Sequence, residues 1–302
     1  MEDYLLRAKN LQIKYATNKG YFTAVSGVDM CIKPNEVFGI VGESGSGKST
    51  LVNGLLRLLP ATAITSADEI TFQNRSMLDI SSRELRKLRW EQISYIPQGA
   101  MNILNPVMTI RDHFKDTILD HEGRIKKQDL EERITASLEL VNLKPSVADA
   151  YPHELSGGMK QRVCITMATL LNPALIIADE PTSALDVISQ RTVIQILAAV
   201  RENLAASMIM IGHDMALQAQ ISDRMGIMFA GYFVEVGSVQ DIFNNPIHPY
   251  TKGLIQSIPS IRKKQDISTL ASRELTEEQR HYYAAPRPLA EVSPGHFVAV
   301  FS

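Results

Sequence analysis

A glycine-rich run followed by lysine and serine contains the residues best suited to chemistry. It fits the pattern G-x-x-x-x-G-K-[ST], between an apolar strand-like run and a helix-like run. Glycines let the backbone wrap closely around an anion, and N–H groups at a helix start carry partial positive charge. The lysine adds a full charge, and the serine hydroxyl is an oxygen ligand for Mg²⁺. The pattern predicts a nucleotide phosphate site made by Gly42, Ser44, Gly45, Ser46, Gly47, Lys48, Ser49 and Thr50.

Two adjacent acids follow a second apolar run, Ala174–Ala178. In open α/β sheets, ligands bind where the strands end, so we expect both carboxylates at the site. Asp179 is expected to hold Mg²⁺ through its hydration shell. Glu180 is expected to polarise the water that attacks the phosphate. The alternative, two solvated acids at a strand end, is disfavoured because the chain also carries the phosphate-loop pattern.

Two further polar residues each follow a strand-like run. Gln98 follows Ile93–Pro97, and its amide is suited to reach both Mg²⁺ and the attacking water. His213 follows the apolar run Ser207–Gly212. A lone Gln or His is more often structural, but the position of each directly after its own strand favours a functional role.

The run Leu155–Arg162 reads LSGGMKQR, and we expect Ser156 to begin a helix as its N-cap. Glycines at a helix N-terminus form an anion site. This run resembles the signature of the ATP-binding cassette (ABC) family. Other runs resemble ATPase subunits of oligopeptide/dipeptide importers, over about residues 3 to 260. They are the phosphate loop, the LNPVM run Leu104–Met108, the HELSGGM run from His153 and the HPYT run His248–Thr251.

The resemblance implies a fold and several further roles. Two cassettes would face each other head to tail, with ATP bound between the signature of one cassette and the phosphate loop of the other. His213 would contact the γ-phosphate and Asp186 would belong to the interface loop that follows the acids. Tyr15 would stack on adenine, with Phe22 as a rival for that role. The residues expected to contact ATP in the partner subunit are Ser156, Gly157, Gly158 and Gln161.

The elements that position these residues follow the same order. Residues 3–35 look strand-rich, with turns at Asn18–Gly20 and at Pro34–Asn35, and residues 36–97 and 173–237 alternate strand and helix, which predicts a mostly parallel sheet. Residues 99–171 look helical, and residues 246–302 look like an irregular packed extension with a short helix near 270–280. The fold class is therefore α/β: a P-loop NTPase (RecA-like) core, an N-terminal antiparallel β subdomain, a helical signature subdomain and a C-terminal extension. We expect the cassette to cover residues 1–245.

The family resemblance implies an ATPase that powers import, of peptides or alternatively of oligosaccharides or metal chelates. Its expected ligands are ATP and Mg²⁺. Its expected partners are a paralogous ATPase in a heterodimer, two transmembrane permeases and, indirectly, a solute-binding protein. The heterodimer is expected because Met159, directly after Ser-Gly-Gly, is the residue typical of the first of the two paralogous ATPases. It would lie on the cytoplasmic face of the membrane. Rival hypotheses are a soluble ABC ATPase acting on DNA or ribosomes and an inactive regulatory subunit.

The composition limits the functional classes to which this protein can belong. The 302 residues are 45% hydrophobic, and the net charge is −2. The chain therefore lacks the excess of positive charge that would indicate binding to nucleic acid. No apolar run approaches the ~18 residues of a membrane span, and the first residues lack a signal peptide pattern. Cys31 and Cys164 form no disulfide framework, which suggests a reducing cytosol. Some relatives hold an iron–sulfur cluster with four C-terminal cysteines; none follows Cys164, so we expect no such cluster.

Overall fold

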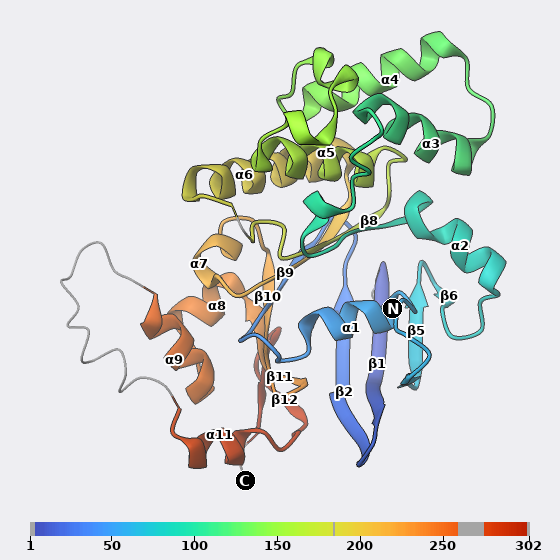
Figure 1. Ribbon diagram of the computed structural model, residues 1–302. Coiled ribbons are helices and arrows are strands. Elements are labelled where there is room, and N and C mark those ends of the chain that lie inside the picture. The colour runs from blue at the N-terminus through green and yellow to red at the C-terminus, as the bar shows by residue number, and fades with distance from the viewer. Residues whose placement is uncertain (1–3, 184, 259–274, 301–302) are drawn as a thin grey trace. The chain divides into compact units, whose positions relative to one another are not determined.

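The computed structural model describes residues 4–183, 185–258 and 275–300 (Figure 1). The chain divides into two compact units. The first, here the loop unit, combines residues 1–79 with 210–302, and the second, here the helical unit, comprises residues 80–209. The helical unit contains the whole segment predicted to be helical, residues 99–171, while the predicted cassette boundary at residue 245 stays a prediction.

The loop unit begins with an antiparallel sheet, as the turn signals predict. β1 (Leu6–Thr17) and β2 (Gly20–Ile32) form a long hairpin closed at Asn18-Lys19, where Thr17 Oγ1 donates to the Gly20 carbonyl over 2.7 Å. The strand order is β2-β1-β5-β6, and β4 also pairs with β1. The shorter strands are β4 (Ala63–Ser66), β5 (Glu69–Phe72) and β6 (Arg75–Ser76).

A second group of strands in the loop unit carries the phosphate loop. β3 (Val37–Val41) is buried at every residue, as expected for a strand covered on both faces. It pairs in parallel with β10 (Arg224–Phe229), and β10 pairs antiparallel with β11 (Tyr232–Ser238). The phosphate loop joins β3 to α1 (Lys48–Leu55). The strand–loop–helix order predicted from the sequence is therefore confirmed.

The C-terminal extension is more regular than the sequence suggested. β12 (Leu289–Ser293) and β13 (His296–Ala299) form a hairpin, and β13 pairs with β11. The expectation of irregular chain there was wrong, because Pro286 and Pro288 precede β12, Pro294 lies in the turn before β13, and Pro249 opens α9. Pro294-Gly295, with Gly295 at φ +76°, fits a type II turn. The helix expected near 270–280 is α11 (Glu277–Tyr283), and residues 270–274 lie outside the described residues. The part of the loop unit that the structure describes also contains α7 (Met215–Gln218), α8 (Val239–Asn244) and α9 (Pro249–Ser257).

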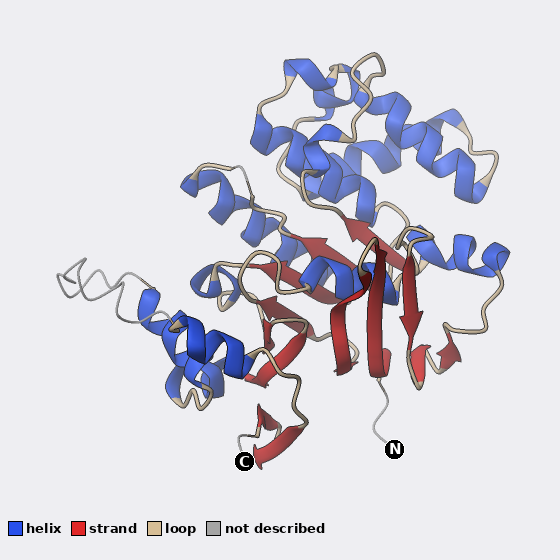
Figure 2. Ribbon diagram, turned by 60° about the horizontal axis from the view of Figure 1, so that its bottom comes forward, coloured by secondary structure: helices blue, strands red, loops and turns tan. Residues whose placement is uncertain are grey.

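The helical unit contains a parallel strand pair and a group of helices (Figure 2). β7 (Ile93–Ile96) runs parallel to β8 (Leu175–Asp179), as predicted for two strands that end at site residues. Its α-helices are α2 (Ser82–Glu91), α3 (Ile110–Glu122), α4 (Lys127–Leu140), α5 (Gly157–Thr169) and α6 (Val187–Leu204). Its 3₁₀ turns are η1 (Ala100–Asn102), η2 (Pro145–Asp149) and η3 (Pro152–Glu154). β9 (Ser207–Gly212) crosses the division between the units.

Apolar spacing accounts for the packing of the helices. Leu130, Ile134 and Leu138 are the buried residues of α4, as their four-residue spacing predicts. α3 adds Phe114 and Ile118 to the buried core. Among the helices of the described ranges, none has both the length and the apolar content that a membrane span requires.

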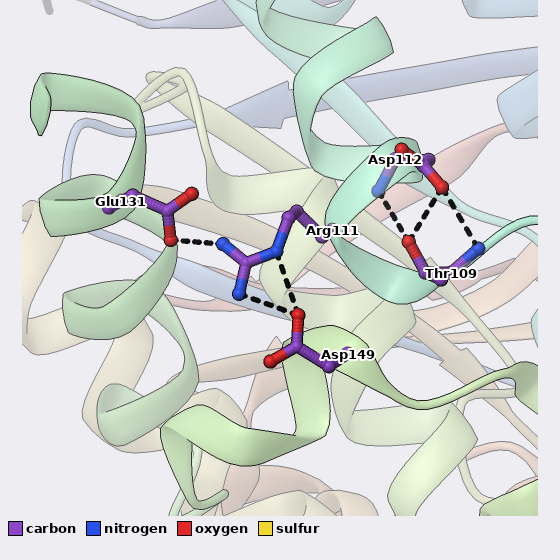
Figure 3. Close-up of polar contacts among 5 residues, drawn as sticks. All are labelled: Thr109, Arg111, Asp112, Glu131 and Asp149. Atoms are coloured by element: carbon purple, nitrogen blue, oxygen red, sulfur yellow. Dashed lines mark hydrogen bonds and ion pairs between the residues drawn. The ribbon is translucent and has the colours of Figure 1, made fainter. Parts of the chain in front are cut away.

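Arg111 on α3 links three elements of the helical unit (Figure 3). Its Nε and Nη2 donate to Asp149 Oδ1 of η2 over 2.9 and 2.8 Å. Its Nη1 pairs with Glu131 of α4. Thr109 caps the same helix, with the Asp112 carboxylate bonded back to it in a capping box. The guanidinium group therefore ties α3 to α4 and η2 at their polar edges.

We expect Arg111→Met to lower the free energy of unfolding by about 0.5–1 kcal/mol, as is usual for partly exposed ion pairs, and less at high salt. Urea unfolding at two salt concentrations measures this. Arg124→Met, which changes an exposed arginine in the loop between α3 and α4, is the matched control. Equal effects of the two substitutions would contradict the linking role of Arg111.

Candidate functional site

Two glycines give the phosphate loop its shape. A Cβ added at Gly42 would lie 2.1 Å from the Met228 carbonyl oxygen, so only glycine fits beside β10. Gly47 has φ +104°, and a Cβ there would lie 2.6 Å from the Ala24 carbonyl oxygen. The loop is further pinned where Gly231 N donates to the Ser46 carbonyl over 2.9 Å. Backbone carbonyls of β10 and β2 therefore lie directly against both glycines of this loop.

The Lys48 ammonium group lies within the loop itself. The residue is 5% exposed. Its Nζ donates to the Gly42 and Glu43 carbonyls, both over 2.8 Å, and to Ser46 Oγ over 3.4 Å. A phosphate offers the same donors charged oxygens, which form stronger hydrogen bonds than neutral carbonyls. Ser44 and Gly45 form the exposed tip, and Ser49 and Thr50 open α1, so the structure brings all eight predicted loop residues into one turn.

The helical unit brings the two acids and Gln98 together. Asp179, the last residue of β8, is 1% exposed and accepts a hydrogen bond from Tyr95 Oη over 3.0 Å. Gln98 Nε2 donates to Glu180 Oε2 over 3.0 Å. Glu180 has φ +46°, a left-handed conformation that is uncommon for a side chain of this kind. Ser183 N and Oγ hold that turn by donating to the Glu180 carbonyl over 3.0 and 2.9 Å.

Tyr95 is the member of this group that sequence reasoning missed as a site residue. It lies on β7, three residues before Gln98, and β7 runs beside β8. A polar ring in a short buried strand that leads to Gln98 was the available signal. Its hydroxyl fixes one oxygen of a carboxylate that is almost fully buried, so the orientation of Asp179 depends on Tyr95.

The signature begins α5, and the expected N-cap is confirmed. Ser156 Oγ accepts from Met159 N over 3.3 Å. Ser156 and Gly157 are exposed, whereas Gln161 is 3% exposed and lies inside the helical unit. A Cβ added at Gly158 would lie 3.2 Å from Ser189 Oγ on α6.

The predicted interface loop leads into α6. Asp186 caps this helix by accepting from Ile188 N and Ser189 N, both over 3.0 Å. The Ser189 hydroxyl also donates to Asp186 Oδ2 over 2.7 Å, and this bond, followed by the backbone bonds, lowers the pKa of Asp186 below its usual range. Ala184 lies outside the described residues. Ser189 therefore contacts both the signature, at Gly158, and the interface loop, at Asp186. Its side chain is small enough for the start of α5 to lie close to α6.

The remaining predicted residues belong to the loop unit. Tyr15 and Phe22 are directly opposed on β1 and β2, so their rings share one face of the hairpin. Phe22 is 62% exposed and Tyr15 is half-buried, and the adenine role of either stays a prediction. His213 is exposed in the turn between β9 and α7. The predicted site residues thus form two sets, one in each unit.

The sequence of this chain is similar to two family models and to known transport proteins. A family model described as ABC transporter matches residues 25–183, and one described as oligopeptide/dipeptide transporter, C-terminal region, matches residues 234–284. The dipeptide transport ATP-binding protein DppD of Caldanaerobacter subterraneus is 40% identical over 258 residues, covering 85% of this chain and 79% of that protein. The oligopeptide transport ATP-binding protein OppD of Escherichia coli is 39% identical over 261 residues, covering 86% and 77%.

Solved structures agree on the fold. The ATP-binding cassette MJ0796, in a dimeric post-hydrolysis state bound to ADP and Pi, matches with TM-score 0.68 and 28% identity over 78% of this chain and 98% of that one. The cbiO1 protein of Clostridium perfringens, part of an ABC transporter complex, matches with TM-score 0.66 and 26% identity over 81% and 92%. The α/β fold class predicted from the sequence is confirmed.

We expect Tyr95→Phe to slow ATP hydrolysis about 10-fold and to raise the Mg²⁺ concentration needed for half-maximal rate, because it removes a hydrogen bond that orients a carboxylate suited to Mg²⁺. Hydrolysis rates across a Mg²⁺ titration measure both effects. Tyr21→Phe, at an exposed tyrosine of β2, is the control. An unchanged Mg²⁺ dependence would show that the Tyr95 hydroxyl has no part in orienting Asp179.

Proposed function

Because this chain belongs to the ABC transporter family, we propose that it is the ATP-hydrolysing subunit that powers peptide import by a membrane transporter. The observation that carries the catalytic part is the Gln98–Glu180 hydrogen bond at the end of β8, beside the buried Asp179. The match of residues 234–284 to the C-terminal region of oligopeptide/dipeptide transporters supports peptides as the substrate class. The chain is thus an ATPase, and its cargo is the proposal.

The chemistry proposed for these residues is an in-line displacement. The oxygen of water attacks the γ-phosphorus of ATP, the bond to the bridging oxygen breaks, and ADP leaves. Glu180 takes the proton of the attacking water, and the Gln98 amide holds that carboxylate in place. Lys48 and the N–H groups of the loop bind the phosphates and stabilise the charge that develops on them. His213 is proposed to contact the γ-phosphate.

Three of the predicted residues carry oxygen donors of the kind that Mg²⁺ prefers. A serine hydroxyl, an amide oxygen and a carboxylate are the hard ligands that this ion prefers, and the carboxylate is held by Tyr95. We propose that Ser49, Gln98 and Asp179 hold it, with Asp179 acting through the hydration shell. When bound, Mg²⁺ neutralises charge on the transferred phosphate.

The exposed start of α5 is proposed to complete the ATP site of a second cassette. Ser156 and Gly157 present a helix N-terminus, with its partial positive charge, to the surface. We propose that the second cassette is a paralogous subunit and that Asp186 and Gln161 support the same interface. Two transmembrane permeases, reached at the cytoplasmic face of the membrane, and an extracytoplasmic solute-binding protein complete the proposed assembly.

The proposed function as a whole is tested by reconstitution. The chain, a paralogous cassette and two permeases in vesicles should take up peptide only with ATP and with the solute-binding protein. Uptake of an oligosaccharide or a metal chelate, with no uptake of peptide, would contradict the proposed substrate class while leaving the ATPase assignment standing.

Glu180→Gln removes the proposed base and keeps the size of the side chain. We expect ATP binding to persist and hydrolysis to fall about 10²–10⁴-fold, the usual contribution of a general base. Phosphate release by the assembled transporter measures the rate, with Glu139→Gln on the exposed side of α4 as control. Turnover near that of the unsubstituted protein would remove Glu180 from the mechanism.

Ser156→Arg places bulk and charge where the partner's ATP is proposed to lie. Transport should stop while ATP affinity at the Lys48 site stays largely unchanged, and a crosslink from the Ser156 region to the partner's phosphate loop should disappear. Ser81→Arg removes the N-cap of α2 in the same unit and controls for the loss of a helix cap. Crosslinks formed only between two copies of this chain in a working transporter would contradict the heterodimer.

A further inference from the structure

The HPYT run, His248–Thr251, has no part in the chemistry proposed above, yet it is buried in the loop unit. His248 and Thr251 are both fully buried, and Tyr250 is 3% exposed. The run opens α9, which contacts β11 (Figure 1). A buried polar run at the start of a C-terminal extension needs a structural reason, because most buried polar groups in proteins form hydrogen bonds.

A buried carboxylate on β11 anchors the run. Glu235 is 0% exposed, and three groups donate to it. They are Ile247 N over 2.9 Å, His248 N over 3.0 Å and His296 Nε2 over 2.8 Å. Since a buried carboxylate is tolerated only when its oxygens are satisfied, this group fixes the chain at 247–248 and β13 relative to β11.

His248 in turn sets the position of Tyr250. Burial lowers the pKa of His248 to about 4, so its ring is neutral at physiological pH. The ring accepts a hydrogen bond at Nδ1 from Tyr250 N over 3.0 Å and so caps α9. The Tyr250 ring packs on Phe229 at the end of β10, with centroids 4.6 Å apart. The backbone N–H and the ring of Tyr250 are therefore both fixed, and together they set the position of its hydroxyl.

That hydroxyl contacts the phosphate loop directly. Glu43 N donates to Tyr250 Oη over 3.1 Å. Arg280 of α11 grips the side chain of the same residue, with Nη1 and Nη2 donating to the two carboxylate oxygens over 2.8 and 3.2 Å. Glu43 also offers its carbonyl to Lys48 Nζ over 2.8 Å. One loop residue thus connects the C-terminal extension to the lysine that binds phosphate.

We propose that Tyr250 and Arg280 are positioning residues that hold Glu43, and through it Lys48, in the geometry that binds the phosphates of ATP. The inference rests on the proposed role of Lys48. A loop that is already ordered loses less conformational entropy on binding than a mobile one, so affinity depends on what orders it. The C-terminal extension is then a working part of the nucleotide site and sets the affinity for ATP.

The two contacts differ in strength and in sensitivity to salt. The Glu43 N–H bond to a buried hydroxyl is screened little by salt. The Arg280–Glu43 pair is bidentate but more than one-third exposed at each side chain, so its contribution is small and falls as salt rises. Salt therefore separates the effects of the two residues.

The test is a titration of the full chain with a fluorescent ATP analogue. We expect Tyr250→Phe, which keeps the ring, to raise Kd about 3- to 10-fold, as for loss of one hydrogen bond. Arg280→Met should raise Kd about 2-fold at low salt and leave it unchanged at high salt. In the assembled transporter, KM for ATP should rise while kcat at saturating ATP stays the same.

Matched controls lie on the same two helices. Tyr282→Phe on α11 removes an exposed hydroxyl, and Lys252→Met removes an exposed cation from α9; both should leave Kd unchanged. Glu43→Gln combined with Arg280→Met should raise Kd by less than the product of the single effects, since both remove one pair.

The outcomes are distinguishable. An unchanged Kd for Tyr250→Phe overturns the inference, as does a lower melting temperature with unchanged Kd, because the run would then only stabilise the fold. Lys48→Ala tests the premise separately and should abolish measurable binding. If Lys48→Ala binds ATP normally, the proposed phosphate site is wrong. If only Tyr250→Phe binds normally, the positioning role alone is wrong.

Discussion

The close packing of the glycine backbone of the phosphate loop against two neighbouring strands is the constraint on which the rest of the structure depends. Gly42 and Gly47 leave no room for a Cβ, because the carbonyl oxygens of Met228 and Ala24 lie where it would be. The loop therefore has one shape, and that shape directs its carbonyls to Lys48 Nζ. The loop connects strand β3 to helix α1, and it packs against β10 and β2.

Hydrolysis places a different demand on the helical unit. The base has to be held beside a buried carboxylate, and the chain does this with backbone geometry. Glu180 takes a left-handed φ of +46° immediately after β8, where a regular strand would send the next side chain to the opposite face. Such conformations cost about 1 kcal/mol or more and persist where surrounding bonds fix them, here those of Ser183 and Gln98.

Features that are local in sequence could be predicted, and those that depend on distant pairing could not. The phosphate loop, the acids after β8 and the Ser156 cap are contiguous patterns, and each was placed correctly on its element. The contact between Glu43 N and Tyr250 joins residues 207 positions apart, which no local pattern encodes. Tyr95 was missed for the same reason, since its partner Asp179 lies on another strand. The hairpin of β12 and β13 was missed because its strands are short and bordered by prolines.

A structure of the chain with Mg²⁺ and a non-hydrolysable ATP analogue would show whether Lys48 and its loop bind the phosphates of ATP. We predict that Lys48 Nζ lies about 2.8 Å from phosphate oxygens, the usual length of a charge-assisted bond, while it keeps its hydrogen bond to the Glu43 carbonyl. Phosphates bound elsewhere, with no phosphate oxygen within hydrogen-bond distance of Lys48 Nζ, would contradict this assignment.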